Sequence, residues 1–167
     1  MSRIFRFLLV TAFALPTLVQ GAENWHGKPY DNLFDVGGMT GMGILDGRVG
    51  YEVRGSVAVK VAHHGFFPDI NNQLFLELQP GILFISGSTA FTYSLHLRWD
   101  FNMNEDWSFY AVGGFGGDIT GHTLGDRVEL YPRLGIGARW NVYANFGFRF
   151  EFSHEFTGIG VAVPLPI

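Results

Sequence analysis

The chain has 167 residues, of which 11 are Lys or Arg, 15 are Asp or Glu and none is Cys, for a formal net charge of −4. This length suits one domain, the lack of cysteine excludes a disulfide framework and a lipid-anchored cysteine, and the scattered basic residues exclude an electrostatic nucleic-acid surface. The chain contains 23 Gly and 17 Phe, yet no apolar run beyond residue 22 is long enough for a membrane-spanning helix. The hydrophobic residues must therefore be distributed over β-strands.

The first 22 residues have the layout of a secretory signal peptide. Arg3 and Arg6 form a basic start, an apolar run follows over residues 7–19, and small residues stand at Gly21 and Ala22. The apolar run is shorter than the ~20 residues that a spanning helix requires, so a signal peptide is favoured over a membrane anchor. We expect cleavage after Gly21 or Ala22 and export of the mature chain.

Apolar and polar residues alternate through most of the remaining chain. From Phe91 to Phe101, every odd-numbered residue is apolar or aromatic and every even-numbered residue is polar. Successive side chains of a β-strand point to opposite faces, so such a segment is predicted to be a strand with one apolar and one polar face. In chain order, strands are expected over 34–44, 48–62, 72–85, 89–101, 106–117, 127–140, 142–153 and 157–165. The first is the weakest, because glycine disfavours strands.

The segments between these strands predict antiparallel hairpins. Asp46-Gly47 and Ser86-Gly87 are typical of tight hairpin turns, and Asn141 is expected to separate two strands. Pro80 and Pro132 fall within predicted strands, and each should mark a bulge or a rim position because proline lacks an amide donor. Loops are expected over 63–71, 102–105, 118–126 and 155–158.

The two faces of the strands differ in size and charge. Phe, Leu, Tyr and Trp are too large to fill the narrow interior of a barrel of about eight strands, whereas Gly, Ser and Ala fit there. Lys28 and Lys60 are the only lysines, and arginine suits confined networks because its planar guanidinium pairs well with carboxylates. We therefore expect the polar face to point inward and to close the lumen with ion pairs. The expected lumen network consists of Glu52, Arg54, Glu77, His96, Arg98, Asp100, Glu129, Arg133, Arg139, Arg149 and Glu151.

Large aromatic residues gather near the ends of several predicted strands. If the first strand rises from the periplasmic side, these residues fall on a single rim, as expected for an aromatic girdle at a membrane interface. A strand of about 13 residues at ~3.3 Å per residue, tilted near 40°, covers roughly 33 Å, which is enough to span an outer membrane. The expected girdle consists of Trp99, Phe101, Trp107, Trp140 and Tyr143.

This pattern, the leader and the chain length resemble the small eight-stranded outer-membrane β-barrels of the OmpA, OmpX and OmpW type. The resemblance implies an all-β, antiparallel up-and-down transmembrane barrel of about eight strands in a Gram-negative outer membrane. It also implies contact with outer-membrane lipid and lipopolysaccharide, and with the barrel-assembly machinery during biogenesis. Such families commonly end in Phe or Trp, whereas this chain ends in VAVPLPI. The expected parts are a signal peptide over 1–22, a periplasmic segment over 23–32 and the barrel over 33–167.

Three functional classes remain open for such a chain. A non-enzymatic barrel with a structural or surface-interaction role is favoured. The loops expected to face outward, 118–126 and 155–158, are too short for a large adhesive surface. A transport barrel similar to OmpW is the alternative, and it would show a hydrophobic lumen with a lateral opening. The third class is a hydrolase similar to the lipid A deacylases.

The hydrolase hypothesis depends on one strand. Ser94, His96 and Asp100 share its polar face, and they carry the hydroxyl, imidazole and carboxylate of a hydrolytic triad. The deacylase motif runs His-x-Ser followed by Asn, whereas the order here is Ser-x-His without that Asn, so we expect no enzyme. No cofactor or metal is expected either, because the adjacent His63 and His64 diverge on a strand and no third ligand is evident. The sequence does not indicate which molecule the surface loops would bind.

Overall fold

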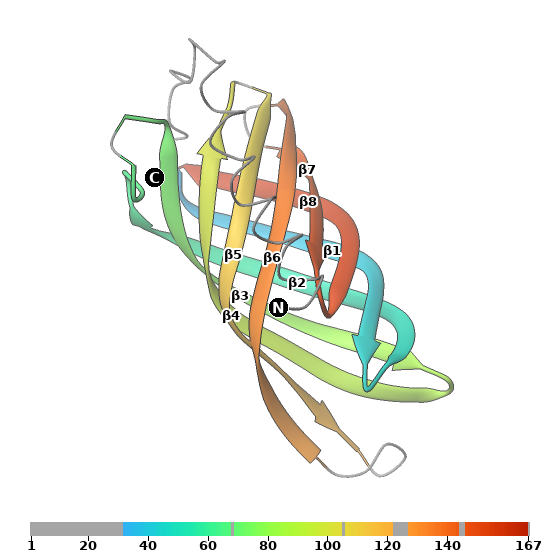
Figure 1. Cartoon of the computed structure of the whole chain (residues 1–167). Coiled ribbons are helices and arrows are strands. Elements are labelled where there is room, and N and C mark those ends of the chain that lie inside the picture. The colour runs from blue at the N-terminus through green and yellow to red at the C-terminus, as the bar shows by residue number, and fades with distance from the viewer. Residues whose placement is uncertain (1–31, 68, 105, 122–126, 144–145, 167) are drawn as a thin grey trace, which may run out of the picture.

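Eight antiparallel strands form a closed barrel (Figure 1). The computed structural model describes residues 32–67, 69–104, 106–121, 127–143 and 146–166. Each strand pairs with its neighbour in the chain, and the last strand pairs with the first. The strands are β1 (Asn32–Leu45), β2 (Arg48–Ala62), β3 (Asn72–Ile85), β4 (Ser88–Asn102), β5 (Trp107–Thr120), β6 (Arg127–Tyr143), β7 (Phe146–Ser153) and β8 (Phe156–Pro166). The predicted fold is confirmed, including the glycine-rich first strand and the proline-containing last strand.

The predicted export segments lie outside the described residues. This applies to the signal peptide over 1–22 and to residues 23–31 of the periplasmic segment predicted over 23–32, whereas Asn32 already belongs to β1. These boundaries therefore stay predictions. Among the described residues, no helix is long and apolar enough to cross a membrane.

Two hairpins close with the turns that their dipeptides predict. Asp46, Gly47, Ser86 and Gly87 all have φ between 44° and 79°, the left-handed backbone of the type I′ turn that matches the twist of paired strands. The prediction that Asn141 separates two strands is wrong. Asn141 lies inside β6, and its side chain is buried. Its backbone N–H donates to the backbone carbonyl of Asp106 at 2.6 Å.

Two other loops are shorter than predicted. β5 continues through Asp118 to Thr120, because both residues still pair with β6. The turn between β7 and β8 comprises only His154 and Glu155 instead of residues 155–158. The turns at 46–47, 86–87 and 154–155 lie at one end of the barrel, which we call the hairpin end. Asn32, Pro166 and the loop at 63–71 lie at the other end, which we call the terminal end.

Both internal prolines lie where the strand ladder is interrupted. Pro80 falls in the gap between the pairs Arg54↔Gly81 and Val57↔Leu78, so no pairing with β2 is lost there. Pro132 lies on the part of β6 that extends beyond the end of β7. The missing amide donor is therefore tolerated at both positions.

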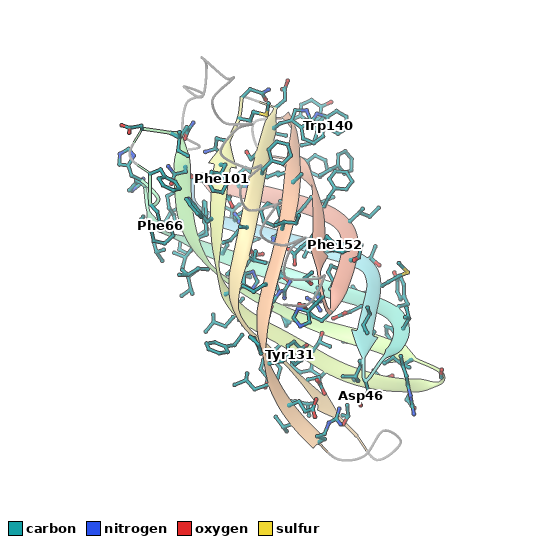
Figure 2. All side chains as sticks on the ribbon, in the orientation of Figure 1. Asp46, Phe66, Phe101, Tyr131, Trp140 and Phe152 are labelled. Atoms are coloured by element: carbon teal, nitrogen blue, oxygen red, sulfur yellow. The ribbon has the colours of Figure 1, made fainter. Side chains whose placement is uncertain are left out.

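The barrel is apolar outside and polar inside. On β4, Phe91, Leu95 and Leu97 are exposed, whereas Thr92, Ser94, His96, Arg98 and Asp100 are buried. A soluble barrel has the opposite arrangement, with its apolar residues in the core. Figure 2 shows the side chains on both faces.

Glycines on the inner face allow the strands to approach each other. A Cβ on Gly114 would lie 2.5 Å from both the Cα of His96 and the carbonyl oxygen of Leu95. The adjacent Gly113 points outward, and a Cβ there would have Leu134 as its nearest neighbour, at 3.7 Å. A methyl group would therefore clash with the backbone at Gly114, whereas it would fit at the adjacent Gly113.

We expect Gly114→Ala to lower the free energy of unfolding by about 1–3 kcal/mol, because backbone atoms must shift to admit the methyl group. Gly113→Ala should be neutral or should stabilise by up to about 1 kcal/mol, because alanine restricts the unfolded chain more than glycine does. Urea titration of the refolded barrel in detergent micelles measures both values. Equal destabilisation by the two variants would contradict the orientation assigned to these glycines.

Candidate functional site: the polar lumen

Six cationic side chains and seven carboxylates are buried in the lumen. They come from β1 to β7 and from the turn before β8, and the alternation within each strand directs them inward. Near balance of charge is required here, because a buried ion without a partner costs several kcal/mol. The cations are Arg54, Lys60, Arg98, Arg133, Arg139 and Arg149. The carboxylates belong to Asp35, Glu52, Glu77, Asp100, Asp118, Glu151 and Glu155.

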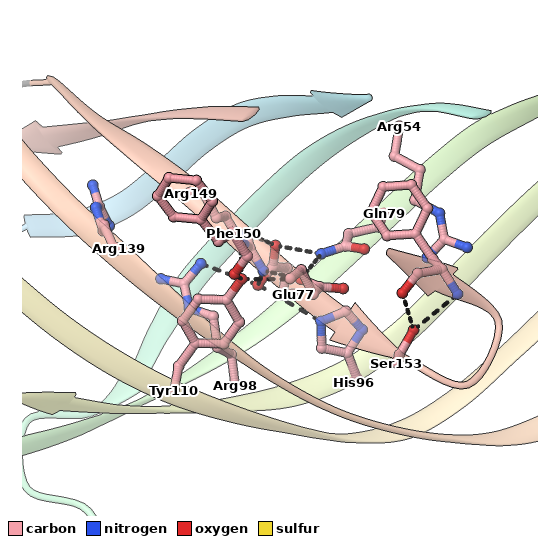
Figure 3. A network of polar contacts seen from close by, with 12 residues as sticks. Arg54, Glu77, Gln79, His96, Arg98, Tyr110, Arg139, Arg149, Phe150 and Ser153 are labelled. Atoms are coloured by element: carbon pink, nitrogen blue, oxygen red, sulfur yellow. Dashed lines mark hydrogen bonds and ion pairs between the residues drawn. The ribbon is translucent and has the colours of Figure 1, made fainter. Parts of the chain in front are cut away.

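Glu77 is the centre of the network (Figure 3). Its Oε2 accepts hydrogen bonds from Arg98 Nη1 at 3.0 Å and from Arg149 Nη2 at 3.1 Å, and its Oε1 accepts from Arg149 Nη1. Gln79 Nε2 donates to Oε1 at 3.0 Å. The imidazole Nε2 of His96 lies 3.6 Å from Oε2. The Glu77 carboxylate is therefore shared by two arginines, one from β4 and one from β7.

Arg149 links this centre to a second carboxylate. Its Nη2 donates to Glu151 Oε2 at 2.7 Å, and its Nε donates to the Tyr110 hydroxyl at 2.8 Å. The guanidinium also lies 4.7 Å from the centroid of the Tyr110 ring, in cation–π contact. Arg133 Nη2 donates to Glu151 Oε1 and, at 2.8 Å, to Gln79 Oε1. β3, β5, β6 and β7 are thereby joined across the lumen.

Asp35 joins two arginines toward the terminal end. Its Oδ2 accepts from Arg98 Nη2 at 2.7 Å and from Arg139 Nη1 at 2.6 Å. Arg98 also donates through Nε to Asp100 at 2.8 Å. Sequence reasoning missed Asp35, because the first strand was predicted from a weak pattern. The available signal was that Asp35 lies two residues before Gly37 and therefore shares the face on which small inward residues were expected.

Another group of ion pairs lies toward the hairpin end. Arg54 Nε pairs with Glu52 Oε1 at 2.7 Å, and the Thr92 hydroxyl donates to the same oxygen at 2.6 Å. Glu155 Oε1 lies 3.0 Å from Arg133 Nε and 3.5 Å from Arg54 Nη1. Sequence reasoning missed Glu155 because it was expected in an outward loop. The early start of β8 brings this residue over the lumen.

Glu129 does not belong to this network. Its side chain is 43% exposed and pairs with Arg127 at 3.0 Å. The reason is that β6 continues beyond the end of β7, so an inward position at this level faces the open mouth of the barrel. The prediction that Glu129 belongs to the closed lumen is therefore corrected.

The aromatic residues predicted for the girdle lie together at the terminal end. Trp107 and Trp140 stack with ring centroids 6.0 Å apart, and Trp99 lies 4.3 Å from Phe101. Tyr143 is exposed at the same end. Figure 2 labels Phe66, Phe101 and Trp140 there, whereas Asp46 lies far from them. The loop after β2 adds Phe66 and Phe67, which contact Trp99 at 5.0 and 5.4 Å.

The triad hypothesis finds no support in the geometry. Ser94 Oγ contacts Arg133 Nη1, Asp100 contacts Arg98, and neither nitrogen of the buried His96 has a hydrogen-bond partner among the described residues. His63 and His64 are both exposed. Within the described ranges, no group of three or more His, Asp or Glu side chains is placed to hold a metal ion.

Comparison with known proteins supports the fold. The sequence matches no protein-family model and no curated protein. Among solved structures, it is similar to Ail, the attachment invasion locus protein of Yersinia pestis, in complex with the heparin analogue sucrose octasulfate. That match has a TM-score of 0.51 and 15% identity, and covers 78% of this chain and 95% of Ail. A structure of Ail alone matches with a TM-score of 0.46 and the same identity and coverage.

Proposed function

We propose that the chain is an integral outer-membrane barrel with a closed polar lumen and a structural or surface-interaction role. The observation that carries this proposal is the inverted distribution of residues, with large apolar side chains exposed around the wall and a nearly balanced set of charges inside. A membrane barrel needs both features, because its wall meets hydrocarbon and the charges inside its narrow lumen must be paired. Outer-membrane lipid and lipopolysaccharide would surround the wall, and the barrel-assembly machinery would insert it.

The terminal end would face the periplasm and the hairpin end would face outward. The aromatic cluster at Trp99 and Trp140 supports a membrane interface at the terminal end, because such residues settle there. Among the outward connections that the structure describes in full, the turns at 46–47, 86–87 and 154–155 have two residues each. The short turns support a local contact surface in preference to a broad adhesive one.

A polyanion site like that implied for Ail finds little support at this end. Arg48 and Arg127 are its exposed cations among the described residues. Arg127 is already paired with Asp46 at 2.7 Å and with Glu129 at 3.0 Å. A cluster of free cations, which would be needed to bind many sulfate groups, is not formed by these residues.

Transport and hydrolysis are less well supported than a closed barrel. A transport barrel of the OmpW kind would need a hydrophobic lumen together with a lateral opening, and the first of these is not met, because this lumen contains Glu77, Arg98 and Arg149 at its centre. A hydrolase would need Ser94 in contact with His96, and Ser94 contacts Arg133 instead. We therefore propose that the protein is not an enzyme.

The closed lumen is tested by electrical recording. The refolded mature chain should give no stable single-channel conductance in planar bilayers, because side chains from seven strands are joined across the lumen. Heat-modifiable gel mobility of the same sample verifies that the barrel is folded. Stable conductance from the folded sample would contradict the closed lumen, and loss of heat modifiability would contradict the membrane barrel itself.

A further inference from the structure

The barrel wall has a gap on one side of β6. Residues 127–134 of β6 pair with β5, but among the described residues the ladder with β7 begins only at Gly135↔Ser153. On the other side of the gap, the amide of Ile44 in β1 donates to the carbonyl of Glu155 at 2.9 Å. Figure 1 shows β6 reaching far past the short hairpin of β7 and β8.

We call this gap the lateral window. Its sides are the β6 edge over 127–134 and the end of β1, and its floor is the turn of His154 and Glu155. Arg127 Nη2 and Asp46 Oδ2, 2.7 Å apart, connect the tips of the two flanking hairpins across its top. Both side chains of this ion pair are partly exposed, so the pair contributes little to holding the two hairpin tips together.

The outer surface around the window is apolar. Leu130 and Leu134 on β6 are 67% and 71% exposed. An open groove of about 640 Å³ lies just below the floor of the window. Phe152 and Thr157, which both line this groove, pair with each other, and a single residue separates each of them from the turn. The residues that line the groove include Thr40, Met42, Ile136, Phe150, Phe152 and Thr157.

The inner side of the window is acidic. Asp118 is 0% exposed, and neither of its carboxylate oxygens has a hydrogen-bond partner among the described residues. It pairs across the ladder with Glu129, which lies on the β6 edge. Among the described residues, the charged groups that act on Asp118 are the carboxylates of Asp46 and Glu129 and the guanidinium group of Arg127. The carboxylates therefore outnumber the cation around this point.

Two kinds of polar group without hydrogen-bond partners among the described residues therefore lie at the window. Among the described residues, the buried Asp118 carboxylate has no hydrogen-bond donor, although such a group requires one. The free β6 edge presents backbone groups that hydrocarbon alone cannot satisfy. A cationic head group that donates hydrogen bonds would pair with the Asp118 carboxylate and with some of the backbone carbonyls of the β6 edge. An anionic head group would be repelled by the carboxylate.

We propose that the lateral window binds an amphiphile with an ammonium head group and a long apolar chain. The head group lies inside the window near Asp118 and Glu129, and the chain passes out over the turn at His154 into the groove beside Phe152. Tyr131 lines the entrance on β6, with its ring edge-on to His154 at 5.8 Å between centroids. This proposal rests on the proposed position of the apolar wall in a membrane.

The test uses the ¹⁵N-labelled barrel in phosphatidylcholine nanodiscs, titrated with dodecylammonium. Saturable shifts are expected at the amides of Tyr131 and Glu155. Asp118→Asn should weaken binding at least tenfold, and it should leave the fold intact because it removes an unpaired charge. The matched control is Asp106→Asn at the terminal end, which should change the affinity less than twofold.

Two further probes separate the head group from the chain. Dodecanoate has a chain of the same length and an anionic head group, and it should give no saturable shifts at the window. Butylammonium has the same head group and a short chain, and it should bind at least tenfold more weakly than dodecylammonium. Equal binding of dodecanoate, or an unchanged affinity in Asp118→Asn, would overturn the proposal.

The proposed membrane position is tested separately from the window. Heat-modifiable mobility and incorporation into nanodiscs are measured first on the unmodified chain. Failure at this stage would contradict the membrane barrel. Normal incorporation followed by shifts spread evenly over the apolar wall would contradict the window alone, because even shifts indicate unspecific partitioning.

Discussion

Glu77→Ala is expected to lower the free energy of unfolding by about 3–5 kcal/mol, because it removes the carboxylate that two buried arginines share. Glu77 accepts hydrogen bonds from Arg98 and from both terminal nitrogens of Arg149. Arg98 retains Asp35 and Asp100, and Arg149 retains Glu151, but the centre of the lumen loses its charge balance. Urea titration in detergent micelles, followed by gel mobility, measures the loss.

Glu129→Ala is the matched control. It also removes a carboxylate paired with an arginine, but the Glu129 side chain is 43% exposed at the mouth of the barrel. Its effect should be far smaller, because water solvates the remaining guanidinium of Arg127. Removing Arg149 together with Glu77 should cost less than the sum of the two single changes. Similar losses for Glu77→Ala and Glu129→Ala would show that the central pairs do not hold the barrel together.

Leu95→Arg is expected to destabilise the barrel in lipid by about 2–4 kcal/mol, because it places a charge on the lipid-facing side near the middle of a strand. Leu95 lies halfway along β4, between the aromatic end at Trp99 and the turn at Ser86, and its side chain is 52% exposed. Refolding into phospholipid vesicles, with urea titration, gives the change in free energy.

Val128→Arg provides the comparison for Leu95→Arg. Val128 is also an exposed aliphatic residue, but it lies at the start of β6 at the hairpin end. Near the membrane interface the cost of an arginine falls to about 0–1 kcal/mol. If the apolar wall faced water, both substitutions would be neutral. A neutral result for Leu95→Arg would therefore contradict the membrane barrel.

Much of the fold could be predicted from local patterns. Alternation in a segment such as 89–101 depends on backbone geometry within that strand, so it can be read without knowing the partner strand. The Asp46-Gly47 turn could also be predicted, because the required positive φ angles are a local property. The extents of β5, β6 and β7 could not, because pairing with the neighbour extends or ends a strand. Asn141 illustrates this: its residue type suggests a turn, yet it lies within the ladder.

The lumen was predictable in character but not in its connections. The inward direction of Glu77 and Arg98 follows from their positions in alternating strands, and both side chains are buried. Asp118 was assigned to a loop, and its position in the ladder between β4 and β6, without a hydrogen-bond partner among the described residues, depends on the pairing of three strands. The lateral window was not predictable either, because it arises from the difference in length between β6 and β7.

The sequence by itself determined that this chain forms two-faced strands with a bulky apolar side and an arginine-rich polar side. That information is local, since the strand period of two residues assigns each side chain to a face. Only the tertiary structure decided which charges meet. Asp35 and Arg139 are 104 residues apart, and they pair because closure of β8 onto β1 brings opposite walls of one narrow lumen within reach of a guanidinium group.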